Sequence, residues 1–67
     1  MKKKIQKQEA ILWADYIRYR EIYGEESSLT QMRLTSWCAV KDLMEVLGLD
    51  SDYTLREYRE TVTLNNP

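Results

Sequence analysis

The chain has 67 residues, with ten basic and eleven acidic side chains, one cysteine and no histidine. This length permits one domain, residues 1–67, which buries only about 60% of the surface of its unfolded chain. Small domains usually gain stability from disulfides, a metal or oligomerisation, and the composition leaves only the last. The sequence therefore predicts a single self-associating domain, with a homodimer as the simplest form.

The cysteine content and the hydropathy both predict a cytoplasmic protein. Cys38 is the only cysteine and cannot form an internal disulfide, and free thiols are typical of a reducing compartment. No segment reaches the roughly 20 apolar residues of a membrane span. The lysines at positions 2–4 are followed by the polar stretch 5–9, where a signal peptide requires an apolar run. We therefore expect no membrane contact.

Charge is distributed unevenly along the chain. Residues 1–23 carry six basic and three acidic side chains, a net charge of +3, whereas residues 24–67 carry four basic and eight acidic ones, a net charge of −4. Opposite net charges attract each other. We expect this attraction to act within the fold or between copies of the chain.

The first predicted helix spans residues 3–23 and is apolar on two faces. One stripe has side chains three or four positions apart, interrupted at Glu9: Ile5, Leu12, Tyr16, Tyr19 and Tyr23. Ile11 and Ile22 lie outside this stripe on a second face, and Gly24 is placed to end the helix. A helix with two apolar faces must be covered on both of them, by other helices of the bundle or by a partner chain.

The second predicted helix spans residues 29–47. Ser28 and Gln31 form a capping box, in which the two side chains satisfy exposed backbone donors. The apolar side chains of this helix occupy nearly half of its circumference, which is wider than a surface helix needs. Gly48 predicts a left-handed C-cap with Leu49 against Met44. We expect this helix to be the central element, with helix 3–23 crossing it.

The third predicted helix spans residues 54–61. Thr54 and Glu57 form a second capping box, and Tyr53 and Tyr58 occupy the positions of a hydrophobic staple. A helix this short must dock to be stable, so we expect it to close one end of the bundle. Residues 62–67 are expected to form an extended tail. The predicted fold is all-α, a small three-helix bundle.

The inventory of side chains argues against catalysis. Without histidine the chain lacks the commonest general base and the commonest transition-metal ligand. Cys38 has no partner that would make it a thiolate, so we expect a small packed thiol. Asp50 and Asp52 have the spacing of the first calcium-loop ligands, but the diagnostic glycine and glutamate positions hold Leu55 and Thr61. We predict a non-enzymatic protein with no catalytic residue, metal or cofactor.

The aromatic residues predict an interface. The chain has five tyrosines, two tryptophans and no phenylalanine, a choice of rings that suits surfaces where one end stays wet. These rings can complete the internal core with their hydroxyls at its edge, or present a binding face, where tyrosine, tryptophan and arginine are enriched. We favour an interface with another protein, formed by Trp13, Tyr16, Tyr19, Arg20 and Tyr23.

A DNA-binding helix-turn-helix is the alternative. Segment 39–60 has the outline of a helix, a turn with glycine and a short helix, with residues 53–60 as the recognition helix. The nucleic-acid contacts would come from basic residues in two places: Lys2, Lys3, Lys4 and Lys7 as a phosphate arm, and Arg56 and Arg59 on the recognition helix. Glu57 and Glu60 place two negative charges on that helix, which opposes its entry into a groove of DNA. Protein binding is therefore the preferred hypothesis.

No family motif is present in the chain. In its size, lysine-rich start, lack of catalytic residues and aromatic content, the chain is similar to the small accessory proteins that phages and other mobile elements of bacteria carry. This general similarity implies a protein that binds a host or phage protein and inhibits or redirects it.

Overall fold

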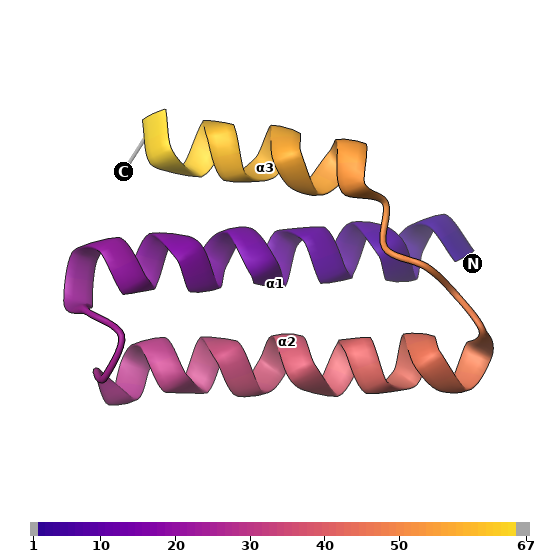
Figure 1. Ribbon diagram of the computed structural model, residues 1–67, viewed down its shortest axis with the longest axis horizontal. Helices are drawn as coiled ribbons and strands as arrows, with labels where there is room; N and C mark the ends of the chain where they lie inside the picture. The colour runs from indigo at the N-terminus through magenta and orange to yellow at the C-terminus, as the bar shows by residue number, and fades with distance from the viewer. Residues whose placement is uncertain (1, 66–67) are drawn as a thin grey trace.

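The computed structural model describes the backbone of residues 2–65 and the side chains of residues 2–61. Within these residues it contains three α-helices (Figure 1): α1 (Lys2–Tyr23), α2 (Ser28–Leu47) and α3 (Tyr53–Asn65). The predicted all-α bundle is confirmed. Helix α3 continues through residues 62–65, which were expected to be extended, and the remainder of the expected tail, 66–67, lies outside the described residues.

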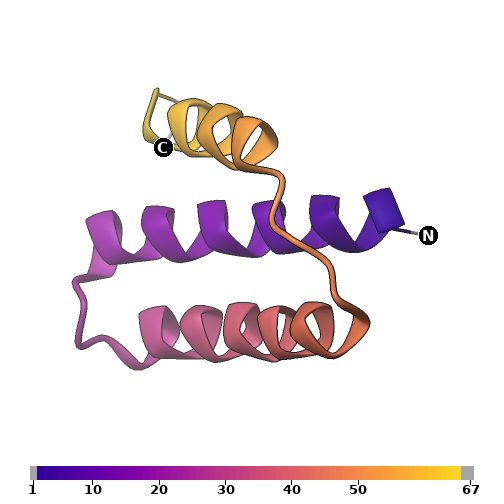
Figure 2. The ribbon, with the colours of Figure 1, turned by 45° about the vertical axis from the view of Figure 1, so that its right-hand side comes forward.

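The central helix is α1. It packs against both other helices, whereas α2 and α3 do not come within 8 Å of each other, measured between Cα atoms of the described chain. Figures 1 and 2 show α2 and α3 on different sides of α1, with α2 antiparallel to it. The expectation that helix 29–47 is central was therefore wrong.

The burial pattern of α1 explains its central position. Ala14 and Tyr16 are both buried, and a helix of 3.6 residues per turn places them about 160° apart. Helix α1 is therefore covered on two sides by helices of its own chain. The second covered side is not the one predicted, because Ile22 is half exposed, whereas Ala10 and Ile17 are buried.

The connection from α1 to α2 begins as predicted and ends differently. Gly24 has a φ of 87°, a left-handed conformation that suits glycine, and its amide donates to the carbonyl of Arg20 at 2.9 Å. The N-cap of α2 is Ser27, one residue before the expected Ser28. The predicted capping box does not form, because the side chain of Gln31 donates through Nε2 to the carbonyl of Glu25 at 2.7 Å and satisfies an acceptor of the loop.

The C-terminus of α2 ends in the predicted Schellman motif. Gly48 has a φ of 69°, and its amide donates to the carbonyl of Glu45 at 3.1 Å. The amide of Leu49 donates to the carbonyl of Met44 at 2.8 Å. These two bonds satisfy carbonyls that the helix end leaves open.

The connection from α2 to α3 passes the N-terminal part of α1, as Figure 2 shows. The side chain of Gln6 donates to the carbonyl of Asp50 at 2.8 Å and ties the connection to α1. Ser51 is buried and accepts a hydrogen bond from Lys41. These contacts hold the connection in place where the chain crosses from one side of α1 to the other.

Asp52 caps α3, which corrects the predicted start of this helix. Its carboxylate accepts from the amide of Leu55 at 3.0 Å, and α3 begins at Tyr53. The capping box expected at Thr54 was therefore misplaced by two residues. Tyr53 and Tyr58, the expected staple, are both exposed.

The apolar core is small. Among the residues whose side chains the structure describes, the buried hydrophobic ones are Ala10, Ala14, Tyr16, Ile17 and Met44. The accessible surface of the chain, 4798 Å², is close to the roughly 4450 Å² that a folded monomer of 8.0 kDa exposes.

Candidate interaction surface

One cluster draws side chains from all three helices, and we call it the Trp–Arg cluster. It consists of Glu9 and Trp13 of α1, Trp37 of α2 and Arg56 of α3. The rings of Trp13 and Trp37 have centroids 4.8 Å apart, and the guanidinium of Arg56 lies 4.3 Å from the centroid of Trp13. Glu60 accepts a hydrogen bond from the indole nitrogen of Trp13. The cluster thus joins α2 and α3 across α1.

Glu9 is the hub of this cluster. Its side chain is fully buried, and one carboxylate oxygen, Oε2, accepts a hydrogen bond from Trp37 Nε1 at 2.7 Å. The same oxygen lies 3.5 Å from Nε of Arg56, whose side chain is 15% exposed. Burying a carboxylate is costly unless it is paired and hydrogen-bonded. What appears in the sequence as an interruption of an apolar stripe is therefore the residue that joins three helices.

The buried ion pair runs against the expected charge asymmetry. Its acidic member, Glu9, comes from the basic part of the chain, and its basic member, Arg56, comes from the acidic part. The predicted attraction between a basic residue of 1–23 and an acidic residue of 24–67 is seen only at the surface of the described chain, where Arg20 lies 3.9 Å from Glu25. Exposed pairs of this kind contribute about 0–1 kcal/mol. The net charges of the two parts therefore do not describe how the helices are held together.

Of the predicted interface residues, the structure buries Tyr16 and engages Trp13, which is partly buried, in contacts between helices. Trp13 belongs to the Trp–Arg cluster, and Tyr16 is only 5% exposed. The hydroxyl of Tyr16 donates to Glu25 Oε1 at 2.7 Å, and Arg20 lies 5.5 Å from its ring. The hydrogen bond to Glu25, followed by burial, raises the pKa of Tyr16 above its ordinary value of 10.0. The ring of Tyr16 is therefore not available to a partner of the folded chain.

The other three predicted interface residues lie at the surface near the end of α1. The rings of Tyr19 and Tyr23 have centroids 5.4 Å apart, and Tyr23 is half exposed. Arg33 of α2 stacks 4.7 Å from the centroid of Tyr19 and donates to its hydroxyl at 3.1 Å. Tyr19 and Arg20 are partly buried. This end of α1 offers a small aromatic edge beside α2.

The residues of the nucleic-acid alternative are not brought together as a helix-turn-helix requires. Helices α2 and α3 lie on different sides of α1, and no Cα atoms of the two described helices come within 8 Å of each other, so segment 39–60 does not form that motif. Arg56 points into the Trp–Arg cluster, and Nε of Arg59 is buried. The predicted phosphate arm is exposed along the start of α1: Lys2, Lys3, Lys4 and Lys7. Of the two arginines of the predicted recognition helix, Arg56 is therefore engaged inside the bundle.

The outward side of α2 is the largest feature that the interface prediction missed. The wide apolar arc of this helix is divided: Met44 is fully buried and Trp37 contacts Glu9 of α1. Large apolar side chains elsewhere on the arc are exposed: Leu29, Met32, Leu43, Val46 and Leu47. Val46 is 83% exposed and Met32 is 64% exposed. The excess width of the arc is the sequence signal for this surface.

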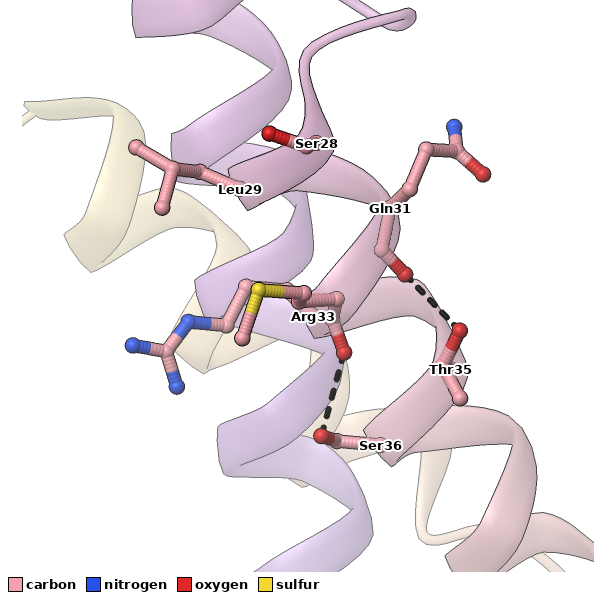
Figure 3. A pocket seen from close by; sticks show the side chains of 7 residues that line it. Ser28, Leu29, Gln31, Arg33, Thr35 and Ser36 are labelled. Atoms are coloured by element: carbon pink, nitrogen blue, oxygen red, sulfur yellow. Dashed lines mark hydrogen bonds between the residues drawn. The ribbon is translucent and has the colours of Figure 1, made fainter.

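Hydroxyl groups on the first half of α2 are turned back onto the helix (Figure 3). Thr35 donates to the carbonyl of Gln31 at 2.9 Å, and Ser36 donates to the carbonyl of Met32 at 3.1 Å. These residues line a shallow open pocket together with Leu29 and other neighbours on α2. Because the hydroxyls are already bonded, the surface is more apolar than its composition indicates.

The structure corrects the expectation for Cys38, whose side chain is exposed and not packed. Among the described residues, no group of three or more histidine, cysteine, aspartate or glutamate side chains is placed to hold a metal ion. None of the described helices has the length and apolar character needed to cross a membrane.

The chain matches no protein-family model, and neither a curated protein nor a solved structure matches it.

Proposed function

We propose that this chain is a protein–protein interaction module without catalytic activity, and that the outward side of α2 is its binding surface. The observation that carries this proposal is the concentration of exposed large apolar side chains on one side of that helix: Leu29, Met32, Leu43, Val46 and Leu47. Contiguous apolar patches of this kind mark interaction sites. In the accessory role implied by its general make-up, the module binds a protein and inhibits or redirects it.

The interior chemistry supports a binding role over a catalytic one. The fully buried carboxylate of Glu9 is bonded to Trp37 and paired with Arg56. These groups face one another inside the bundle, where they connect helices. A catalytic acid or base must instead reach a substrate within hydrogen-bond distance. We therefore assign the buried charges to folding and the apolar surface to function.

The aromatic edge near the end of α1 extends the proposed surface. Tyr19 contacts Arg33 of α2, and Tyr23 is stacked on Tyr19. Interfaces combine an apolar centre with a more polar rim, and tyrosine and arginine are enriched in them. We assign Tyr19, Arg20 and Tyr23 to the rim of the site and the apolar side chains of α2 to its centre.

Photo-crosslinking in the cells that produce the protein tests this proposal. The photoreactive residue p-benzoylphenylalanine would replace Met32 in one variant and Leu43 in another, both of which are exposed on α2. The matched control is the same replacement at Tyr58, an exposed ring on α3. We expect protein adducts, with a second copy or with another protein, from Met32 and Leu43 in excess of those from Tyr58. Failure of both α2 positions to form adducts in the folded protein would contradict the proposal.

A further inference from the structure

Arg56 of α3 fills a cage that the other two helices build. Its guanidinium carbon lies 4.3 Å from the ring centroid of Trp13 and 5.8 Å from that of Trp37, and its Nε lies 3.5 Å from Oε2 of Glu9. Aromatic rings and a carboxylate are groups that bind cations in protein sites. Glu9, Trp13 and Trp37 belong to α1 and α2, and we call these three residues the cation cage.

The cation cage is held together by contacts that do not involve α3. The rings of Trp13 and Trp37 have centroids 4.8 Å apart, and Trp37 Nε1 donates to Oε2 of Glu9 at 2.7 Å. This hydrogen bond fixes the carboxylate beside the two rings. Because each of these contacts joins α1 to α2, the cage keeps them when α3 moves away.

Arg56 leaves part of the hydrogen-bonding capacity of the cage unused. Oε1 of Glu9 is buried and has no hydrogen-bond partner in the described chain, and the same is true of Nε of Arg56. Their 3.5 Å contact through Oε2 is longer than the about 2.7–2.9 Å of a good charged N–H···O bond. A guanidinium can donate two parallel bonds to one carboxylate. An arginine that is free of the backbone of α3 can therefore bond both oxygens of Glu9.

Helix α3 holds Arg56 in the cage with a face that is mostly polar. None of the described side chains of α3, residues 53–61, is fully buried, and the partly buried ones are Leu55, Arg56, Arg59 and Glu60. Glu60 accepts a hydrogen bond from the indole nitrogen of Trp13. Elements with few buried apolar contacts open at a lower free energy than the rest of a fold. We therefore expect α3 to open alone and to take Arg56 out of the cage.

We propose that the cation cage is a binding site for an arginine side chain of a partner protein, and that Arg56 occupies it as an internal ligand until α3 opens. In the closed chain the same residues connect the helices. The cage selects arginine over lysine, because a planar guanidinium stacks on a ring and bonds a carboxylate twice, whereas an ammonium is a point charge. This site lies apart from the outward side of α2 and does not depend on the function proposed for that surface.

The tether makes Arg56 an effective internal ligand in the wild-type chain. A tethered group competes at an effective concentration in the millimolar range. Small guanidinium compounds at such concentrations should therefore not bind to the wild-type chain. A chain that lacks the side chain of Arg56 should bind them in the vacated cage.

Chemical rescue of Arg56→Ala tests the binding site. The probe is ethylguanidinium, which replaces the atoms that the substitution removes. With a dissociation constant on the order of 10 mM, about 50 mM probe should raise the folding equilibrium constant of the variant about sixfold. We expect no rise for the wild type in urea unfolding, and a smaller rise with ethylammonium, which has the same charge. Equal effects of the two cations, or no effect of ethylguanidinium, would overturn the inference.

Arg33→Ala is the matched control for this rescue. The guanidinium of Arg33 lies 4.7 Å from the ring centroid of Tyr19, and no carboxylate is within 4 Å of it in the described chain. We expect ethylguanidinium to leave this variant unchanged, and an equal rescue would overturn the specific role of the cage. If Arg56→Ala is unfolded in buffer, sucrose favours its folded state. The probe must then raise the folded fraction in sucrose, and failure there counts equally against the cage.

Hydrogen exchange tests whether α3 opens and whether the ligand is a peptide residue. In the wild type, α3 amides should exchange as a group with protection at least about tenfold lower than that of α1 and α2. Acetyl-arginine methylamide carries a backbone that α3 obstructs, so in Arg56→Ala it should bind the open state and speed α3 exchange. Ethylguanidinium fits beneath α3 and should slow it. Exchange of all three helices only together would overturn the masking by Arg56, as would no acceleration by the arginine derivative.

Free arginine distinguishes the two sources of a guanidinium. Its α-carboxylate carries the same charge as Glu9, and like charges repel, so it should speed α3 exchange less than the methylamide does. A larger effect of the free amino acid would overturn the assignment of a protein partner. The photo-crosslinking experiment is independent of these results: rescue without adducts from Met32 and Leu43 would support the cage and contradict the α2 surface, and adducts without rescue would do the reverse.

Discussion

Trp37 of α2 donates a 2.7 Å hydrogen bond to the carboxylate of Glu9 on α1, which is fully buried. The same carboxylate oxygen pairs with Arg56 of α3 at 3.5 Å. The backbones of α2 and α3 stay more than 8 Å apart between Cα atoms in the described chain, and this one side chain connects both helices to α1. The bundle therefore depends on a charged residue at the place where a larger domain would use an apolar core.

Glu9→Ala should destabilise the fold by about 3–5 kcal/mol, because removing one partner of a buried ion pair leaves the other uncompensated. A domain of this length typically has a total stability of about 3–10 kcal/mol, so we expect a largely unfolded chain. Urea unfolding followed by tryptophan fluorescence and circular dichroism measures the change. Glu57→Ala, at an exposed glutamate, should stay within about 0.5 kcal/mol of wild type. A loss below 1 kcal/mol for Glu9→Ala would show that Glu9 does not hold the helices together.

The two methionines of α2 should differ sharply in their contribution to stability. Met44 is fully buried and Met32 is 64% exposed. Met44→Ala should cost about 2–5 kcal/mol, because it removes buried surface and opens a cavity. Met32→Ala should change the stability of the monomer by less than about 0.5 kcal/mol. Thermal or urea unfolding at a concentration where the chain is monomeric compares the stabilities of the two variants. Equal losses of stability would contradict the assignment of Met44 to the core and of Met32 to the surface.

Stability should fall at alkaline pH through Tyr16. Its protonated hydroxyl donates to Glu25, and this bond raises the pKa of Tyr16 in the folded state above 10.0. The folded state then holds the proton more tightly than the unfolded state does. The stabilisation is complete below pH 10 and is lost as the pH rises through the raised pKa of the folded state.

Urea unfolding of the wild type and Tyr16→Phe between pH 8 and pH 11 measures this loss. Tyr16→Phe removes the donor, so the variant should be less stable than wild type at pH 8, and the difference should shrink toward pH 11. Tyr58→Phe, at an exposed ring of α3, serves as the matched control and should leave the profile unchanged. A difference between wild type and Tyr16→Phe that is independent of pH would contradict the role of this hydrogen bond.

Gly48→Ala should destabilise the fold by about 1–2 kcal/mol. Gly48 has a φ of 69°, and a Cβ built there has no atom within 4 Å. The cost therefore comes from the left-handed backbone alone. Gly48→Asn should cost less, because asparagine tolerates this conformation better than alanine does. Urea unfolding midpoints rank the stabilities of wild type, Gly48→Asn and Gly48→Ala. A Gly48→Ala variant as stable as wild type would contradict the assignment of Gly48 as a left-handed C-cap.

Local chemistry allowed several features to be predicted from the sequence. Gly24 and Gly48 end α1 and α2 at the predicted positions, because a residue that readily takes a positive φ acts within its own turn. The N-caps were displaced to Ser27 and Asp52. Neighbouring serine, threonine and aspartate side chains compete for one helix start, and loop contacts such as that of Gln31 with Glu25 decide among them.

The candidate surface was only partly predictable. The sequence places Tyr19, Arg20 and Tyr23 together at one end of α1, and the structure leaves Tyr23 half exposed there. Tyr16 belongs to the same helical stripe and is nevertheless buried. Helical spacing determines which side chains share a face, whereas burial depends on which other helix covers that face.

The sequence by itself determined that this chain forms three helices and that two of them carry more apolar surface than a small bundle needs. Only the tertiary structure decided that α1 is central, that Glu9 is a buried hub, and that much of the apolar arc of α2 faces water. The physical reason is range: caps and helical periodicity act over a few residues, whereas the Trp–Arg cluster joins positions as distant as Glu9 and Arg56. No local pattern records such a contact, because it exists only after the helices have packed.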